Sequence, residues 1–261
     1  MADPVLLERD GAVARITLNR PEVGNALDLP TARALMEAVI ACDEDDAVRC
    51  VLLTGSGRLF CVGGDVAAFA QAGDQLPAFL KEITVYVHAA VARLMRMNKP
   101  VVTAINGSAA GAGIGLAILG DIALADPRAQ FTLAYSAIGL SPDGGTTWLL
   151  PRLIGLRRAQ ELCLRNRRLS AEEAAAMGLV TRVVEGDLMA EASLVAQDLA
   201  RSATPALGMT RRLLLDSATA SLEAQLDAES RGIASVSRTA EGKEGVAAFL
   251  EKRVPNFTGD K

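Results

Sequence analysis

The chain has 261 residues, a mass of 27.3 kDa and a net charge of −4, and half of its residues are hydrophobic. This length is enough for one large domain, or for one domain with a helical appendage. Aromatic residues make up only 3% of the chain and no basic stripe interleaves with them, so the sequence predicts no nucleic-acid partner.

The chain also predicts no membrane association and no export. The N-terminal stretch carries early acidic residues and lacks the long apolar core that is typical of a signal peptide. The most apolar segment, residues 100–125, is interrupted by Asn106, by several glycines and by Asp121, which is not typical of a membrane-spanning helix.

Cysteine and histidine usage argues against a metal or a disulfide. The chain has a single histidine, His88, and no two of its cysteines form a CxxC pair. We therefore expect a reducing, cytoplasmic environment, no metal and no cofactor. The four cysteines are Cys42, Cys50, Cys61 and Cys163.

The first half of the chain alternates buried strands with helices, which predicts right-handed crossovers and a largely parallel sheet. Asp28, with Pro30 behind it, is a candidate helix N-cap, and Asp65 is another. Beyond Gly144 the pattern is mostly helical, with one short strand near 181–184. The earlier expected strands cover 13–18, 50–53, 101–105 and 122–125, and the expected helices follow Asp28, follow Asp65, and cover 76–97 and 111–119.

Two glycine-rich stretches, residues 60–66 and 106–115, each follow a buried strand and open a helix. Small residues there leave backbone N–H groups uncovered, and a helix N-terminus adds positive potential. Two such N–H groups aimed at one point form an oxyanion hole. The alternative for either stretch alone is that its glycines only permit tight turns and close packing.

Taken together, the two stretches resemble the enoyl-CoA hydratase/isomerase (crotonase) superfamily, whose members stabilise the enolate of an acyl-CoA thioester. The resemblance runs from about Val13 to Phe257. It implies an α/β crotonase (ClpP-like) fold, with stacked ββα turns and a C-terminal helical trimerisation region. We accordingly divide the chain into a spiral core with the acyl-CoA site, residues 1–186, and a helical region, 187–261. The motifs that carry the resemblance are 19–21 with 25–27, 52–55 with Gly57, 60–66, 99–100, 106–107, 139–140, 174–180 and 248–253.

By resemblance, the oxyanion donors are the backbone N–H groups of Gly64 and Ala112. A backbone donor is expected to tolerate glycine or alanine equally. The acyl-CoA, which carries the only coenzyme that we expect, is held mainly by backbone. Phe249 and Lys252 on a late helix approach a coenzyme A that can belong to a neighbouring copy, although packing for Phe249 and a solvated face for Lys252 are alternatives. The remaining CoA-binding residues implied by the resemblance are Asn25, Ala26, Leu27, Gly63, Asp65, Val66 and Gly111.

The acid/base groups of a hydratase are missing. Hydratases of this superfamily place one glutamate three residues after the second oxyanion donor and another about twenty residues further on. This chain has Gly115 and Tyr135 at those places. Hydration needs a positioned water and a delivered proton, so their absence argues against hydratase activity. Tyr135 is expected to line the substrate pocket.

Asp143 remains as the candidate catalytic carboxylate. The surrounding stretch, residues 138–145, resembles the isomerase branch and especially the phenylacetate-pathway isomerases, which act on a ring epoxide of phenylacetyl-CoA and also shift enoyl-CoA double bonds. One alternative is a helix cap after Pro142. Another is a dehalogenase of the 4-chlorobenzoyl-CoA type, with Asp143 as nucleophile and His88 as base, although His88 can equally be an ordinary helix residue. Weak hydratase activity and a non-catalytic acyl-CoA-binding protein also stay open.

Overall fold

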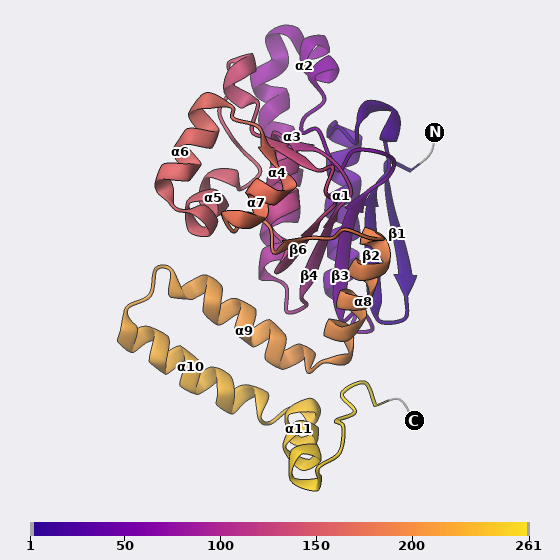
Figure 1. Cartoon of the computed structure of the whole chain (residues 1–261), viewed down its shortest axis with the longest axis vertical. Coiled ribbons are helices and arrows are strands. Elements are labelled where there is room, and N and C mark those ends of the chain that lie inside the picture. Colours follow the sequence, from indigo (N-terminus) through magenta and orange to yellow (C-terminus); the bar gives the residue numbers. More distant parts are fainter. Residues whose placement is uncertain (1–2, 260–261) are drawn as a thin grey trace.

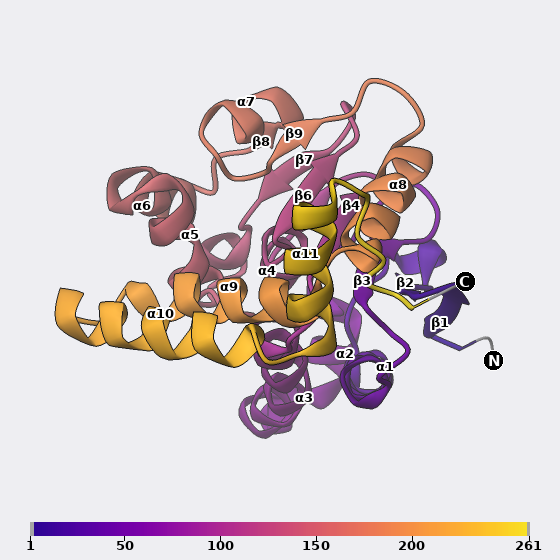
Figure 2. The ribbon, with the colours of Figure 1, turned by 90° about the horizontal axis from the view of Figure 1, so that it is seen from below.

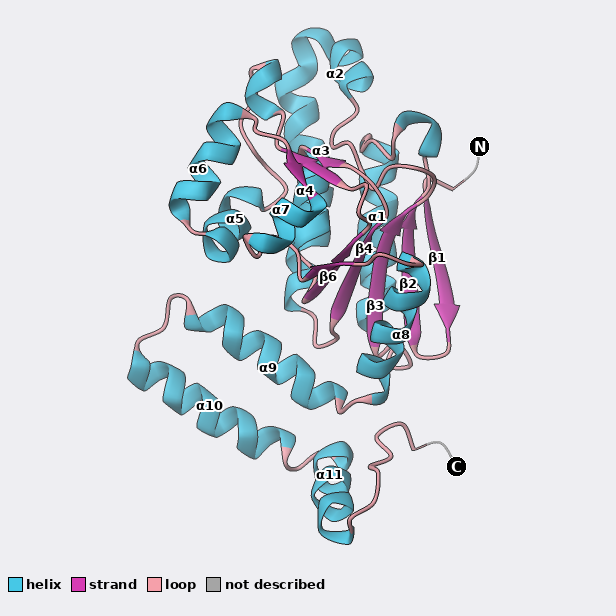
Figure 3. Cartoon of the chain, viewed as in Figure 1, coloured by secondary structure: helices cyan, strands magenta, loops and turns pink. Residues whose placement is uncertain are grey.

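The computed structural model of the chain describes residues 3–259 and contains two sheets surrounded by helices (Figures 1 and 3). The larger sheet has the strand order β1-β2-β3-β4-β6-β9, and a smaller sheet has the order β5-β7-β8. The strands are β1 (Val5–Asp10), β2 (Val13–Leu18), β3 (Cys50–Gly55), β4 (Val101–Ile105), β5 (Ala109–Ala110), β6 (Ile122–Ala125), β7 (Gln130–Thr132), β8 (Leu169–Ser170) and β9 (Arg182–Val183).

The larger sheet is parallel from β2 to β9, and only the β1–β2 pair is antiparallel. The β1–β2 hairpin turns at Gly11, whose φ of 58° favours glycine. The four strands expected from the alternating pattern, β2, β3, β4 and β6, are all present, as is the late strand β9. The sequence pattern did not predict β1 or the smaller sheet.

Helices cover both faces of the larger sheet. One face packs against α1 (Leu29–Glu44) and α3 (Leu76–Arg96), and the other packs against α8 (Leu188–Arg201). Each face of the sheet therefore has its own hydrophobic core: the first core lies on the side of α1 and α3, and the second lies on the side of α8. Because side chains alternate along a strand, Val51 and Leu53 of β3 belong to the first core, while Cys50 and Leu52 belong to the second. The remaining helices of the first 186 residues are α2 (Val66–Ala72), α4 (Ala112–Ile118), α5 (Thr146–Ile154), α6 (Leu156–Arg165) and α7 (Ala171–Ala176).

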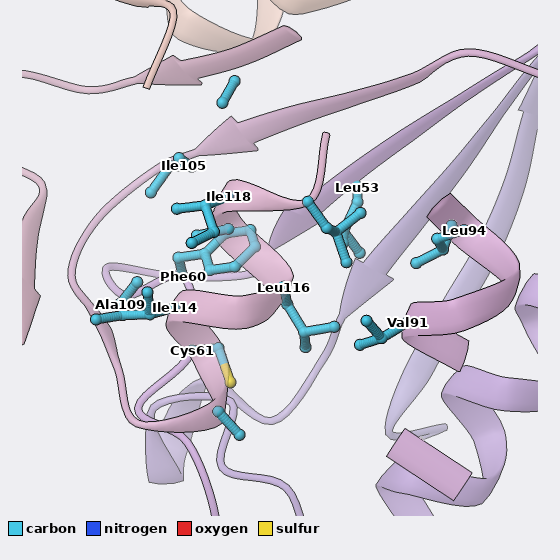
Figure 4. Close-up of a cluster of buried hydrophobic side chains, with 14 of the residues drawn as sticks. Leu53, Phe60, Cys61, Val91, Leu94, Ile105, Ala109, Ile114, Leu116 and Ile118 are labelled. Atoms are coloured by element: carbon cyan, nitrogen blue, oxygen red, sulfur yellow. The ribbon is translucent and has the colours of Figure 1, made fainter. Parts of the chain in front are cut away.

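The first core supports the two glycine-rich turns from behind. Phe60 and Cys61, the first two residues of the first glycine-rich stretch, are fully buried, and Phe60 lies beside Ile114 and Ile118 of α4 (Figure 4). A rigid apolar base under both turns fixes their positions relative to each other.

Local capping explains where several helices begin. The carboxylate of Asp28 accepts the N–H of Thr31 at 2.9 Å, as the sequence predicts for the start of α1. Asp65 likewise caps α2, accepting the N–H groups of Ala67 and Ala68 at 3.1 and 3.2 Å. Both predicted caps are therefore confirmed.

The last three helices, α9 (Thr204–Ser217), α10 (Leu222–Val236) and α11 (Ala240–Glu251), lie below the sheet in Figure 1, and Figure 2 shows them from below. Arg49 ties this region to the sheet, because its guanidinium donates to the carbonyls of Ala200 and Ser202 and to Glu241. The predicted helical character of the C-terminal third is confirmed, whereas its division at 187 into a separate domain stays a prediction.

Within residues 3–259, no helix combines the length and the apolar character that crossing a membrane requires.

Candidate active site

A cavity of about 320 Å³ lies between the two glycine-rich turns, α2, α3 and the segment after β7. Seven of the residues expected at the site line it, from five separate parts of the chain. Its walls are otherwise mostly aliphatic. The expected residues are Leu27, Gly64, Val66, Gly111, Ala112, Tyr135 and Asp143, and the other lining residues are Val62, Phe69, Leu80, Ile83, Thr84, Val87, Leu133, Ala134, Ile138, Leu140 and Ser141.

The two glycine-rich turns are in direct contact. A Cβ added to Gly63, which has a φ of 91°, would lie 2.8 Å from the carbonyl oxygen of Ala110 and 3.2 Å from the amide nitrogen of Ala112. A Cβ on Gly113 would lie 2.2 Å from the carbonyl oxygen of Cys61. Glycine is therefore needed at both positions for close approach of the backbones.

The N–H groups of Gly64 and Ala112 are left without a protein acceptor. The neighbouring backbone groups are paired: Leu27 N–H donates to Gly63 O at 2.7 Å and Gly111 N–H donates to Thr132 O at 3.2 Å. In the described part of the chain, by contrast, no hydrogen bond is donated by Gly64 N–H or Ala112 N–H. Both residues line the cavity, so a substrate oxygen could accept from the two.

Gly64 also packs against an aromatic ring. A Cβ on Gly64 would lie 2.3 Å from Cζ of Phe69, which is carried by α2. Phe69 in turn makes an edge-to-face contact with Phe79, with 6.1 Å between ring centroids. The expectation that glycine and alanine are equally tolerated therefore does not hold at residue 64 unless the Phe69 ring moves.

The carboxylate of Asp143 faces the cavity and is bonded to Tyr135. The phenol Oη donates to Oδ1 at 2.5 Å. Burial, and then the negative charge of Asp143, raise the pKa of Tyr135 above its usual value. The phenol therefore remains a hydrogen-bond donor throughout the neutral pH range.

Asp143 does not cap the helix that follows it. The N-cap of α5 is Gly145, with no side-chain cap, and the Asp143 side chain points to Tyr135 instead. The backbone carbonyl of Asp143 accepts from the amide and the hydroxyl of Thr146 at 3.1 and 2.8 Å. The helix-cap alternative is therefore wrong for the side chain of Asp143, which is free to face a substrate.

His88, on α3, contacts the residue next to Asp143. Its Nε2 accepts the N–H of Gly144 at 3.2 Å, which assigns the ring proton to Nδ1 when the imidazole is neutral. His88 thus anchors the backbone of the Asp143–Gly144 turn, and its Nε2 lone pair is occupied by a peptide N–H.

The hydratase glutamate places are both unavailable. Gly115 lies under Gly144, so that a Cβ at residue 115 would stand 2.1 Å from the carbonyl oxygen of Gly144. Tyr135 fills the other place and directs its hydroxyl to Asp143. The Asp143–Gly144 turn therefore occupies the space that a side chain at residue 115 would need.

Asn25 and Asp65 use their side chains within the protein. The Asn25 amide donates to the carbonyls of Ser56 and Leu59 at 3.0 and 2.9 Å and clips their loop in place. Asp65 caps α2 through Oδ1, and its Oδ2 accepts from Arg20 at 3.3 Å. Asn25, Ala26, Gly63 and Asp65 do not line the cavity, so the structure does not bring these four expected residues to it.

Phe249 and Lys252 lie on and just after α11, at the end of the molecule opposite α2 (Figure 1). The Phe249 side chain is 83% exposed. The structure therefore does not bring these two residues to the cavity of their own chain, and a role in binding coenzyme A requires a second copy.

The wall of the cavity formed by α3 was not predicted from the sequence. Leu80, Ile83, Thr84 and Val87 all line the cavity. Their spacing places them on one helix face, but the same spacing is typical of a face that packs against a core.

Across the described range, no cluster of His, Cys, Asp and Glu side chains could hold a metal ion.

The combination of a spiral α/β core with two facing glycine-rich turns defines a protein of the crotonase class. The sequence profile described as "Enoyl-CoA hydratase/isomerase" matches residues 8–260, and the chain belongs to this family. The predicted family and fold class are thus confirmed.

Individual relatives within the family have different activities. The chain is 40% identical to the 1,2-epoxyphenylacetyl-CoA isomerase of Escherichia coli K12, over 99% of this chain and 100% of the relative. It is 31% identical to 4-chlorobenzoyl coenzyme A dehalogenase-2 of an Arthrobacter species, over 96% and 91%. The crystal structure of an enoyl-CoA hydratase from Polaromonas sp. JS666 superposes with a TM-score of 0.92 at 34% identity, covering 97% of this chain and 98% of that one.

Proposed function

We propose that this chain is an acyl-CoA isomerase in which Asp143 moves a proton between two carbons of the acyl group. The observation that carries the proposal is the placement of the Asp143 carboxylate in the same cavity as the unpaired N–H groups of Gly64 and Ala112. A base beside an oxyanion hole is what enolate chemistry needs.

In this mechanism the thioester oxygen accepts hydrogen bonds from Gly64 and Ala112. Asp143 takes a proton from one carbon, and the electron pair moves into the thioester to form an enolate, whose negative oxygen the two N–H groups stabilise. The protonated Asp143 then returns the proton to a different carbon, which shifts the double bond. No covalent bond to the enzyme forms, and no metal or further cofactor takes part in the proposal.

Hydration is disfavoured by the occupied glutamate places. Gly115 is covered by Gly144, and Tyr135 binds Asp143, so neither of these two places supplies a second carboxylate to hold and activate a water. The relatives include proteins named for both activities, and the geometry at Gly115 supports the isomerase.

Dehalogenation is the second candidate, because Asp143 and His88 both occupy the places that the resemblance requires. In that reaction Asp143 attacks an aromatic ring and His88 activates the water that cleaves the resulting ester. The hydrogen bond from Gly144 N–H to His88 Nε2 argues against it, since the nitrogen needed to accept a proton from water is already occupied.

The cavity favours an uncharged acyl group. Among the described residues that line the cavity, Asp143 is the only carboxylate and none is a lysine or an arginine. A carboxylate at the far end of the acyl chain would therefore meet aliphatic walls and lose its hydration without compensation. Unsaturated aliphatic acyl-CoA esters and ring-epoxide phenylacetyl-CoA both meet this condition.

The proposal is tested with 3-enoyl-CoA esters and with epoxyphenylacetyl-CoA, in H₂O and in D₂O. The wild-type protein is expected to shift the double bond or to convert the ring, and NMR should show deuterium exchange at the acyl carbons. Asp143→Asn should lose the activity by at least about a thousandfold while it still binds the CoA ester by calorimetry. Full activity in Asp143→Asn would reject Asp143 as the group that moves the proton. Acyl-CoA binding by the wild type without exchange or turnover would reject the isomerase and leave a binding protein.

A further inference from the structure

Among the described residues, Tyr135 donates the shortest side-chain hydrogen bond to Asp143. We propose that Tyr135 is a positioning residue: its hydroxyl holds Oδ1 of Asp143 and so leaves Oδ2 as the atom that exchanges protons with the substrate. This inference rests on the proposed isomerase function. It assigns Tyr135 a role beyond that of a pocket wall.

The geometry of the bond makes the two carboxylate oxygens different. The phenol Oη lies 2.5 Å from Oδ1, and no hydrogen bond to Oδ2 of Asp143 is present among residues 3–259. The terminal torsion of an aspartate is broad, so a carboxylate without partners samples many orientations. A single strong donor on one oxygen restricts that torsion, because hydrogen bonds to charged groups are stronger than those between neutral groups.

Tyr135 itself is held rigidly. Its side chain is only 9% exposed, and the short helix that it opens, η3 (Tyr135–Ile138), is entered through Ala134 at a φ of 57°. The N–H of Leu140 donates to the Tyr135 carbonyl at 3.0 Å and closes the turn. A donor on a fixed turn can orient its acceptor, whereas a mobile donor would follow it.

The Tyr135 ring lies close to the second glycine-rich turn. A Cβ built on Gly111 would lie 3.9 Å from Cζ of Tyr135, at ordinary van der Waals distance. Gly111 directly precedes Ala112, whose N–H is the proposed oxyanion donor. Tyr135 therefore lies near the oxyanion hole as well as the base.

The kinetic test compares Tyr135→Phe with Tyr86→Phe. The chain has two tyrosines, and Tyr86 lies outside the cavity, where its hydroxyl accepts from Arg33 at 3.2 Å. Tyr135→Phe is expected to lower kcat of the isomerisation about 10- to 100-fold and to change KM by less than about threefold. Tyr86→Phe should match the wild type.

The division of the effect between kcat and KM separates positioning from a merely structural role. A positioning residue acts on the chemical step, so Tyr135→Phe should lower kcat and kcat/KM by about the same factor, whereas a distorted pocket would also raise KM. A kcat within about threefold of the wild type would overturn the proposal. So would a rise in KM as large as the loss in kcat.

A readout without substrate keeps this inference testable if the isomerase function itself fails. 3-Fluorotyrosine in place of both tyrosines should give two ¹⁹F NMR resonances, and Tyr86→Phe assigns them. In Asp143→Asn the Tyr135 resonance should shift, because its phenol loses the negatively charged acceptor. The Tyr86 resonance should not respond. An unchanged Tyr135 resonance would show that the bond to Asp143 is absent in solution and would overturn the proposal, whatever reaction the protein performs.

Discussion

Gly115 and Gly144 approach each other so closely that a Cβ on Gly115 would lie 2.1 Å from the carbonyl oxygen of Gly144. We therefore predict that restoring the hydratase carboxylate by Gly115→Glu does not create a hydratase. The side chain would push the Asp143–Gly144 turn out of place, which should abolish isomerase activity and lower the free energy of unfolding by about 1–3 kcal/mol. Thermal melting and the hydration of crotonyl-CoA measure the two effects.

Gly186→Ala is the matched control for this substitution. No atom lies within 4 Å of a Cβ built on Gly186, so the added methyl group should leave both stability and activity unchanged. Wild-type protein should hydrate crotonyl-CoA poorly or not at all. Hydration at a typical enzymatic turnover of about 10 per second, in the wild type or in Gly115→Glu, would contradict the proposal that this site does not act as a hydratase.

Gly64→Ala should impair the oxyanion hole through Phe69. The new methyl group would lie 2.3 Å from Cζ of Phe69, so either the ring or the Gly64 backbone must move. We expect kcat to fall about tenfold or more, since displacing one oxyanion donor costs up to about 4 kcal/mol of transition-state stabilisation.

Phe69→Leu in the same chain tests the cause of that loss. A smaller side chain at residue 69 makes room for the methyl group, so the double variant Gly64→Ala, Phe69→Leu should recover most of the activity that Gly64→Ala loses. Steady-state kinetics on the four proteins of this cycle gives the coupling between the two positions. Additive losses would show that the ring does not restrict residue 64.

Much of the fold could be predicted because its signals are local. In the parallel sheet β3, β4 and β6 are largely apolar runs and β2 alternates, and Asp28 and Asp65 stand where their helices begin. The smaller sheet could not be predicted, since β5 and β8 have two residues each and β7 has three. Runs of that length carry no recognisable period.

The site divides in the same way. The two glycine-rich turns and Asp143 could be identified from motifs, and they do line one cavity. The bond between Tyr135 and Asp143 depends on left-handed backbone at Ala134 and Gly139, with φ values of 57° and 73°. A non-glycine residue rarely adopts that conformation, and no propensity rule indicates it at Ala134. The anchoring of Gly144 by His88 joins residues 56 positions apart, which spacing alone does not reveal.

We predict that the protein assembles as a trimer or as a pair of trimers. The helices α9 to α11 expose large apolar side chains, which a single chain leaves in water. Light scattering at micromolar concentration should give three or six times the mass of the chain, and a monomer would refute the prediction. The exposed side chains are Leu214, Leu222, Leu226, Ile233, Val246, Phe249 and Leu250.

Substitutions at Lys252 and Phe249 test whether assembly contributes to substrate binding. If Phe249 and Lys252 approach the coenzyme A of a neighbouring copy, Lys252→Ala should raise KM for CoA esters several-fold without changing kcat. Lys252→Ala should leave binding of a shortened pantetheine thioester unchanged, because that ligand lacks the adenine nucleotide.

Phe249→Ser should weaken the assembly itself, which dilution in the light-scattering experiment would detect.

Activity should survive exhaustive chelation. The proposed mechanism uses a carboxylate and two backbone N–H groups, and it assigns no step to a metal. Dialysis against EDTA should leave kcat within error of the untreated protein. Loss of activity that a divalent cation restores would overturn the mechanism and would require ligands beyond those described at the cavity.

The last prediction separates the isomerase from the dehalogenase at His88. His88 Nε2 accepts the N–H of Gly144, and the amide oxygen of a glutamine could accept the same bond. His88→Gln should therefore lower isomerase activity by less than about threefold. A dehalogenase with His88 as general base would instead lose ester hydrolysis by about a hundredfold or more, and the ester on Asp143 would accumulate. Intact-protein mass spectrometry after incubation with 4-chlorobenzoyl-CoA distinguishes the outcomes. We expect no added mass on the wild type or on His88→Gln, and a substrate-derived mass on Asp143 would transfer the assignment to the dehalogenase.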